Sequence, residues 1–175
     1  MISRLRGRVV NISDNVLIID IQGVAYEAEV TGATLAMVAG HEGDVDFYTH
    51  LVVRDDTHAV YGFASLAERE LFRALIRVNG IGPKLGLTLL SSLTPEEFAA
   101  SVANQDVAAM TRVPGVGKKT AERLLMELKD RLDTLPVGVA RLATNKESTA
   151  REAELALVSL GYRPLDAARA IDNVY

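Results

Sequence analysis

The chain has 175 residues, with 19 Lys and Arg against 23 Asp and Glu, three histidines and no cysteine. A hydrophobic share of 49% with 24% charged residues is typical of globular proteins rather than disordered ones. The absence of cysteine excludes disulfides, thiol catalysis and cysteine-bound zinc or iron–sulfur centres, and we expect neither a metal nor a cofactor. No apolar run approaches the roughly 20 residues of a membrane helix, and residues 1–7 lack the apolar stretch of a signal peptide, so we expect a cytoplasmic protein.

The net charge of −4 is unevenly distributed along the chain. Residues 1–63 contain 4 basic and 9 acidic side chains, residues 64–134 contain 10 and 9, and residues 135–175 contain 5 of each. An acidic first third argues against a protein that coats nucleic acid over its whole surface. If the chain binds nucleic acid, it does so at selected places and repels it elsewhere.

Residues 1–63 have the pattern of a small β-domain. Short β-branched or alternating segments stand at 16–21, 24–30 and 45–53, and turn-forming residues separate them. Five or six short strands in about 60 residues favour closure into a barrel, because closure removes exposed strand edges. We therefore predict an OB-like β-barrel over residues 1–63.

After residue 63 the apolar residues recur with helical spacing. Ser65 to Glu68 has the sequence of a capping box, in which the serine and glutamate side chains satisfy helix-start amides reciprocally. Thr94 to Glu97 indicates a second helix start, with proline at the first helical position. We predict an all-helical domain of about five helices over residues 64–134.

The last part of the chain is expected to be a separate small module. Residues 135–146 lose the periodic pattern and are interpreted as a linker. Helical spacing returns over 147–175, but two short helices provide a thin core, so we expect this module to be incomplete or to be completed by a partner. The predicted fold class is therefore a multidomain α+β protein.

An internal repeat with an offset of 35 residues is the most informative feature of the sequence. Residues 75–84, LIRVNGIGPK, resemble residues 110–119, MTRVPGVGKK. Each copy places Gly-apolar-Gly between two predicted helices, the helix-hairpin-helix pattern, and the glycines permit a tight turn and close backbone approach. The free N–H groups that start the second helix form an anion site strengthened by the helix dipole. Two such sites predict a grip on the phosphates of a DNA duplex across its minor groove, which fixes position without reading bases.

The predicted DNA-binding residues are those of the two hairpins: Asn79, Gly80, Ile81, Gly82 and Lys84 in the first, and Pro114, Gly115, Val116, Gly117, Lys118 and Lys119 in the second. A P-loop is excluded, because Arg112 stands where its first glycine is required and Lys119 where its Ser or Thr is.

Two other functions fit parts of this pattern. A DNA glycosylase is the enzymatic alternative, since Lys119 occupies the place of the nucleophilic lysine in some of these enzymes. Its catalytic aspartate would fall at Val137, which favours Lys119 as a phosphate contact. A generic duplex-binding module shares the hairpins but gives no reason for an acidic barrel.

Taken together, these motifs resemble the RuvA family, the junction-binding subunits of the bacterial Holliday-junction branch-migration complex. The residues that carry the resemblance are 2–7, 52–56 and 61–63 in the barrel, 79–84 and 113–123 in the hairpins, and 160–162 in the third module. It implies that four subunits form a flat plate that holds a four-way junction open and square. It also implies that Asp55 and Asp56 form an acidic pin at the centre, where they repel phosphates. Without the resemblance, these two aspartates are interpreted as a solvated turn.

The resemblance also implies partners. A RuvB-like ring ATPase would dock on a UBA-like third module through Leu160, Gly161 and Tyr162 and drive branch migration in recombination and repair. A RuvC-like junction resolvase is a second implied partner, and the chain is expected to be a homotetramer that can double into an octamer. This chain would then be the non-catalytic DNA-binding subunit. The family's third module has a further helix after the position of Tyr175, so residues 147–175 are expected to look truncated beside it.

Overall fold

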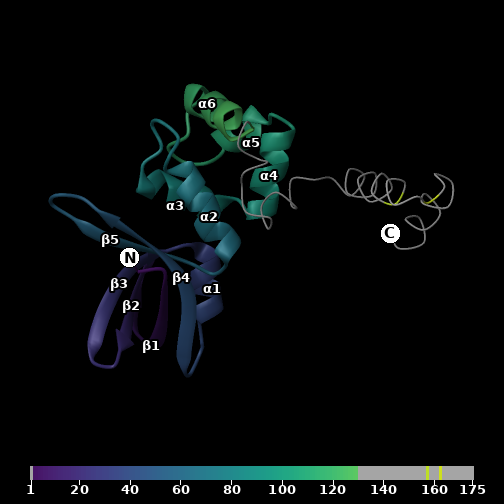
Figure 1. The fold of residues 1–175 in the computed structure, drawn as a ribbon. Helices are drawn as coiled ribbons and strands as arrows, with labels where there is room; N and C mark the ends of the chain where they lie inside the picture. The colour runs from purple at the N-terminus through teal and green to yellow at the C-terminus, as the bar shows by residue number, and fades with distance from the viewer. Residues whose placement is uncertain (1, 130–156, 158–161, 163–175) are drawn as a thin grey trace.

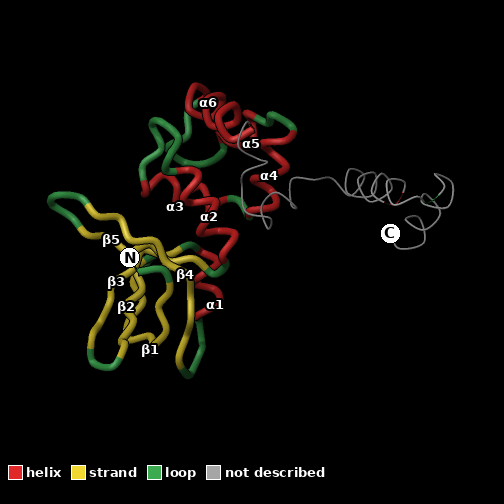
Figure 2. Tube along the Cα trace, viewed as in Figure 1, coloured by secondary structure: helices red, strands yellow, loops and turns green. Residues whose placement is uncertain are grey.

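The computed structural model describes residues 2–129, 157 and 162. Strands gather at one end of this part of the molecule and helices at the other (Figures 1 and 2). The strand end contains β1 (Arg4–Ser13), β2 (Val16–Ile21), β3 (Val24–Val30), α1 (Gly32–Val38), β4 (Asp44–Val53) and β5 (His58–Phe63). The helical end contains α2 (Leu66–Leu75), α3 (Pro83–Ser92), α4 (Pro95–Ala103), α5 (Val107–Thr111) and α6 (Lys118–Lys129). The predicted linker and third module lie outside the described residues, apart from Leu157 and Tyr162.

The five strands form a closed barrel in the order β1-β2-β3-β5-β4. Neighbouring strands are antiparallel except β3 and β5, which close the barrel in parallel. Strand β1 has two neighbours: its first half pairs with β4 and its second half with β2. The pairing with β2 has an irregularity between Val9 and Asn11. This arrangement confirms the predicted OB-like barrel, and β2 and β3 coincide with the predicted strands.

Helix α1 was not predicted from the sequence. It has seven residues and starts at Thr31, whose side chain accepts a hydrogen bond from the backbone N–H of Thr34. A helix this short is stabilised by tertiary packing rather than by intrinsic propensity, and Thr34 and Val38 are its buried residues.

The barrel and the helices share an apolar core. Tyr61 and Phe63 of β5 contact Phe72 of α2, with ring centroids 5.2 Å and 4.8 Å apart. The same cluster continues through the buried residues of all five helices α2 to α6, including Leu124, Leu125 and Leu128 of α6. A second cluster fills the barrel itself. The two predicted regions therefore pack as neighbours with a continuous hydrophobic contact.

The two predicted capping boxes differ in the structure. At α4 both halves are present, since the Thr94 side chain accepts from the N–H of Glu97 and the Glu97 carboxylate accepts from the N–H of Thr94. At α2 the Ser65 side chain accepts from the N–H of Glu68, as predicted. The prediction that the Glu68 carboxylate accepts from the N–H of Ser65 is wrong. It accepts instead from the N–H of Ala64 and from the hydroxyl of Thr31 in the barrel domain.

Candidate nucleic-acid interface

The two hairpin loops are built in the same way. Gly80 and Gly115 have φ values of +90° and +85°, a backbone conformation that glycine adopts without strain. The next residue in each loop, Ile81 or Val116, donates its N–H to the carbonyl three residues earlier, at 3.0 Å and 3.1 Å. The Gly-apolar-Gly pattern thus forms a tight turn at each repeat, as the sequence predicted.

Gly82 and Gly117 stand immediately before α3 and α6. Their carbonyl oxygens accept hydrogen bonds from the first turn of each helix: the N–H of Gly86 donates to Gly82 and the N–H of Ala121 donates to Gly117, each at 2.9 Å. A Cβ added at either Gly82 or Gly117 would meet nothing within 4 Å among the described residues. An anion can therefore approach the backbone closely at both helix starts, where N–H groups and the helix dipole favour negative charge.

The structure divides the predicted hairpin residues into those that face solvent and those that do not. Ile81 and Val116 are only 4% and 6% exposed, and their N–H groups are already bonded within the turns. Four other loop residues are exposed but lie before the helix starts: Asn79, Gly80, Pro114 and Gly115. The exposed residues at the helix starts are Gly82, Lys84, Gly117, Lys118 and Lys119.

The two hairpins also contact each other. Arg123 of α6 donates from Nη1 to the carbonyl oxygen of Asn79 in the first hairpin, at 3.2 Å. Leu85 of α3 lies against the second hairpin, where its Cδ1 would be 3.2 Å from a Cβ at Gly115. The repeat predicted two separate anion sites, and in the structure the two hairpins that would form them contact each other. Neither Arg123 nor Leu85 was singled out as a site residue, because spacing along the chain does not report this cross-contact.

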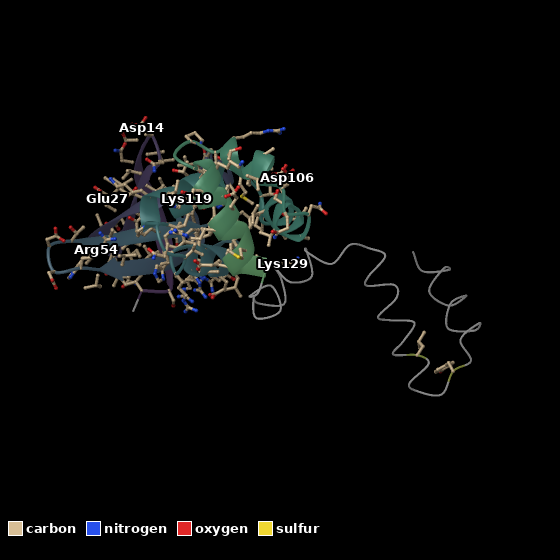
Figure 3. All side chains as sticks on the ribbon, turned by 90° about the horizontal axis from the view of Figure 1, so that it is seen from above. Asp14, Glu27, Arg54, Asp106, Lys119 and Lys129 are labelled. Atoms are coloured by element: carbon tan, nitrogen blue, oxygen red, sulfur yellow. The ribbon has the colours of Figure 1, made fainter. Side chains whose placement is uncertain are left out.

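Asp55 and Asp56 form the tip of the β4–β5 hairpin, which projects from the barrel (Figure 1). Arg54 and Thr57 close the turn, with the Arg54 N–H 2.8 Å from the Thr57 carbonyl oxygen. Both aspartates are exposed. Viewed from above, Arg54 lies on this projecting hairpin, and Lys119 lies on the helices (Figure 3). Within one chain the turn has the form of a solvated loop, and its charges are free to meet a ligand.

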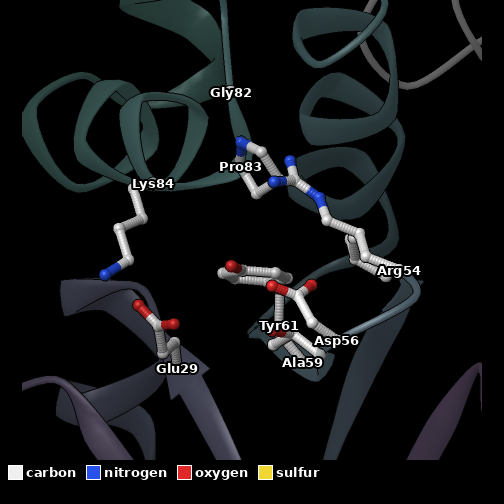
Figure 4. A pocket seen from close by; sticks show the side chains of 10 residues that line it. Glu29, Arg54, Asp56, Ala59, Tyr61, Gly82, Pro83 and Lys84 are labelled. Atoms are coloured by element: carbon white, nitrogen blue, oxygen red, sulfur yellow. The ribbon is translucent and has the colours of Figure 1, made fainter.

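A cleft of about 490 Å³ separates this turn from the first hairpin. Its walls carry both signs of charge: the β4–β5 turn contributes Arg54 and Asp56, β3 contributes Glu29, and the start of α3 contributes Gly82 and Lys84. Figure 4 shows the Lys84 ammonium pointing toward Glu29 across the cleft. Burial, followed by the charge of Glu29, raises the pKa of the Tyr61 hydroxyl in the same wall. Glu29 and Arg54 were not predicted as site residues, because strand alternation does not report what stands across a cleft.

A second polar cluster joins α2 to strand β4 of the barrel. The Glu70 carboxylate pairs with Arg69 at 2.9 Å and with Arg73 at 2.7 Å. Arg73 also donates from Nε to Nδ1 of His50 at 3.3 Å. Burial, and then the positive charge of Arg73, lower the pKa of His50. The contact of Arg73 with His50 was not predicted, because the two residues are 23 positions apart in the sequence.

The predictions of a partner-binding site, of no membrane helix and of no metal site can be compared only with the described residues. Leu160 and Gly161 lie outside the described residues, while Tyr162 is 59% exposed. Among the described residues, no helix is long and apolar enough to cross a membrane. In the same part of the chain, no group of three or more His, Asp or Glu side chains could hold a metal ion.

Comparison with known proteins agrees with this architecture. Residues 1–62 match the family described as RuvA N terminal domain, and residues 72–130 match SAM-like Helix-hairpin-helix tandem. The chain is 52% identical over 180 residues to the Holliday junction branch migration complex subunit RuvA of Pseudomonas putida, covering 98% of this chain and 88% of that protein. The corresponding subunit of Nitrosococcus oceani is 49% identical over 177 residues, with 98% and 89% coverage. That of Thioalkalivibrio sulfidiphilus is 46% identical over 181 residues, with 99% and 90% coverage. The chain belongs to the RuvA family.

Proposed function

We propose that this chain binds four-way DNA junctions as a tetramer, holds them open and square, and targets a RuvB-like ATPase that drives branch migration in recombination and repair. Membership of the RuvA family supports this function, because its members are named as subunits of the Holliday junction branch migration complex. The observation that carries the proposal is the cleft in which the acidic turn of the barrel faces the first of two joined hairpins. One surface thus combines groups that attract phosphate with groups that repel it.

The hairpins supply the attraction. Backbone N–H groups at Gly82 and Gly117, aided by Lys84, Lys118 and Lys119, would hold the phosphates of one duplex arm. Because Arg123 links the hairpins, the two phosphate contacts are held at a fixed separation before DNA arrives. This preorganisation reduces the entropy lost on binding.

The acidic turn supplies the repulsion. In a tetramer with the four turns at its centre, Asp55 and Asp56 would keep backbone phosphates from drifting across the crossover and guide separated strands into new duplexes. An exposed pair of carboxylates costs the free protein little, and it acts when phosphates come within about 10 Å, the screening length at 0.1 M salt.

Within this proposal the chain divides as the sequence predicted. Residues 1–63 carry the pin, 64–134 bind DNA, 135–146 form a linker, and 147–175 bind the motor through Leu160, Gly161 and Tyr162. The chain is the DNA-binding subunit, and ATP hydrolysis belongs to the RuvB partner. We propose Lys119 as a phosphate contact rather than the nucleophile of a glycosylase. The tetramer, its doubling to an octamer and the encounter with a RuvC-like resolvase are tested by native mass measurement with and without junction DNA.

The sharpest test replaces both Asp55 and Asp56 by asparagine. This change keeps size and turn preference but removes two negative charges from each subunit. We expect tighter binding to DNA, more so at low salt, and better competition by linear duplex against the junction. Stability should change by less than about 0.5 kcal/mol, because the side chains are exposed. The measurement is a gel-shift competition between junction and duplex at two salt concentrations.

A matched control lies at the other end of the same strand. Glu42→Gln combined with Asp44→Asn also removes two acidic charges, at the start of β4 rather than at its hairpin tip. This control should leave the junction preference unchanged. If the Asp55 and Asp56 variant binds both DNAs as the wild type does, the aspartates are a solvated turn and the pin proposal fails.

A further inference from the structure

A single buried carboxylate sits where the barrel meets the helices. Glu68, in the first turn of α2, is only 6% exposed. Its Oε2 atom accepts a hydrogen bond from the N–H of Ala64 at 3.0 Å and another from the hydroxyl of Thr31 at 3.2 Å. Ala64 follows β5, and Thr31 caps α1 in the barrel. One oxygen therefore ties together three elements that are far apart in the sequence.

The carboxylate continues a buried polar network inside the barrel. The Thr31 and Thr34 hydroxyl oxygens are 2.9 Å apart, and both residues are fully buried. The carbonyl oxygen of Gly62 accepts from the Thr31 N–H at 3.3 Å and from the Thr34 hydroxyl at 3.4 Å. A Cβ at Gly62 would lie 2.7 Å from the ring of Phe47, so close packing fixes this carbonyl as well. The donors that point at Glu68 are thus held by their own surroundings.

These hydrogen bonds can fix the orientation of the helices relative to the barrel, which the apolar core between them cannot do alone. The contact of Phe72 with Tyr61 and Phe63 holds the two parts together, but burial of apolar surface is not directional. Hydrogen bonds weaken steeply as the angle at the hydrogen departs from linearity. Two of them converging on one oxygen therefore restrict the angle between β5 and α2.

That angle matters because the two elements lead to the two functional parts. Strand β5 begins beside the Asp55–Asp56 turn and ends just before Ala64, and α2 begins just before Glu68 and ends near the first hairpin. We propose that Glu68 is a positioning residue that fixes the acidic turn of the barrel relative to the two DNA-binding hairpins. The inference rests on the proposed binding of four-way junctions, in which hairpins and turn act together. Linear duplex needs the hairpins alone.

The test compares junction and duplex binding by three forms of the full chain. Glu68→Ala removes the acceptor and frees the N–H of Ala64 and the hydroxyl of Thr31. We expect its preference for junction over duplex to fall by roughly fivefold or more, with duplex affinity little changed. Glu68→Gln keeps an amide oxygen that can accept both bonds, so it should retain the wild-type preference. The readout is the ratio of the two dissociation constants, measured below the unfolding temperature of every variant.

The chain offers a matched control for the loss of a helix cap. Glu97→Ala removes the glutamate of the capping box at α4, which is exposed and bonds only to its own helix start. It should lower thermal stability without changing the junction preference. If Glu68→Ala proves unfolded, Thr31→Val, which removes the hydroxyl, is compared with Thr31→Ser, which keeps it. The first should lose the preference and the second retain it.

The outcomes separate this inference from the proposed function. A wild-type chain that binds junction and duplex equally would overturn the proposed function, whatever the variants do. A wild-type preference for the junction that Glu68→Ala or Thr31→Val retains in full would overturn the positioning role alone. Equal losses for junction and duplex would assign Glu68 a purely structural role and would also overturn it.

Discussion

The two hairpins come from one repeated sequence but stand in different surroundings. The first faces the barrel across a cleft that contains Glu29 and Asp56, and its lysine points toward one of these carboxylates (Figure 4). The second hairpin has an acidic neighbour on its own helix instead, Glu122, whose carboxylate is 3.9 Å from the Lys118 ammonium. Equal motifs therefore present unequal electrostatic environments to DNA.

The helix starts differ as well. Pro83 is the first residue of α3 and has no N–H, whereas the equivalent residue of the second copy is Lys118, which has both an N–H and a positive side chain. We infer that the two hairpins contribute unequally to DNA binding, and that the second supplies most of the phosphate affinity. The first hairpin, close to the acidic turn, supplies less affinity and relates the duplex arm to the centre of the junction.

The largest expected effect comes from placing aspartate at the glycine before each helix. Asp is a good N-cap residue, so its carboxylate would bond the free N–H groups in place of a phosphate. Gly117→Asp should abolish junction binding, whereas Gly82→Asp should weaken it without abolishing it. The fold should survive both changes, because among the described residues a Cβ at either position has open space. Gel shifts with junction DNA and thermal unfolding measure the two effects.

Gly117→Asn and Gly82→Asn are the matched controls, because they add the same volume without the charge. They should lose less affinity than the aspartate variants. Junction binding at wild-type strength by folded Gly117→Asp would contradict the anion site at this hairpin. Equal losses at both positions would contradict the unequal contributions of the two hairpins to DNA binding.

The sequence predicted what depends on local pattern. The barrel, the helices after residue 63 and both hairpin turns followed from alternation, helical spacing and the Gly-apolar-Gly repeat, because these properties are set by neighbours along the chain. Glu68 shows the limit of this approach. Its spacing from Ser65 predicted a local capping box, but burial against Thr31 redirected the carboxylate toward Ala64 and the barrel. A local motif does not show that donors from other elements compete for the same carboxylate.

The charges around the site show the same limit. The clustering of acidic residues in the first third predicted repulsion near the DNA, but not that Glu29 would face Lys84. The link from Arg123 to Asn79 spans 44 residues of sequence, and no periodicity points to it. Such contacts depend on how β3, α3 and α6 pack, which is decided by the whole core rather than by either motif.

A smaller effect is expected from single lysines. The dependence of log affinity on log salt has a slope of about −0.9 for each neutralised phosphate of duplex DNA. Lys118→Ala should make this slope shallower by up to about one, and it should leave any preference for base sequence unchanged. Lys84→Ala should change the slope less, because Glu29 and Asp56 line the same cleft and repel phosphate there. Titrations of junction DNA at several salt concentrations measure both slopes, and an unchanged slope for Lys118→Ala would make that lysine a solvated surface charge.

The smallest expected effect concerns pH and the support of the first hairpin. His50 packs its ring 5.7 Å from Phe72 and accepts a hydrogen bond from Arg73, both on the helix that leads into that hairpin. Burial and the nearby Arg73 lower the pKa of His50 in the folded chain, so the unfolded chain binds a proton more readily. The stability that His50 contributes is therefore complete above its ordinary pKa of 6.5 and is lost as pH falls below it.

His50→Gln keeps an acceptor for Arg73 but does not titrate, so the free energy of unfolding should fall less steeply between pH 7 and pH 5 than in the wild type. Urea unfolding at these two pH values measures the difference, with His58→Gln, an exposed histidine of β5, as the control. Equal pH dependence in the wild type and His50→Gln would contradict a lowered pKa for His50 in the folded chain.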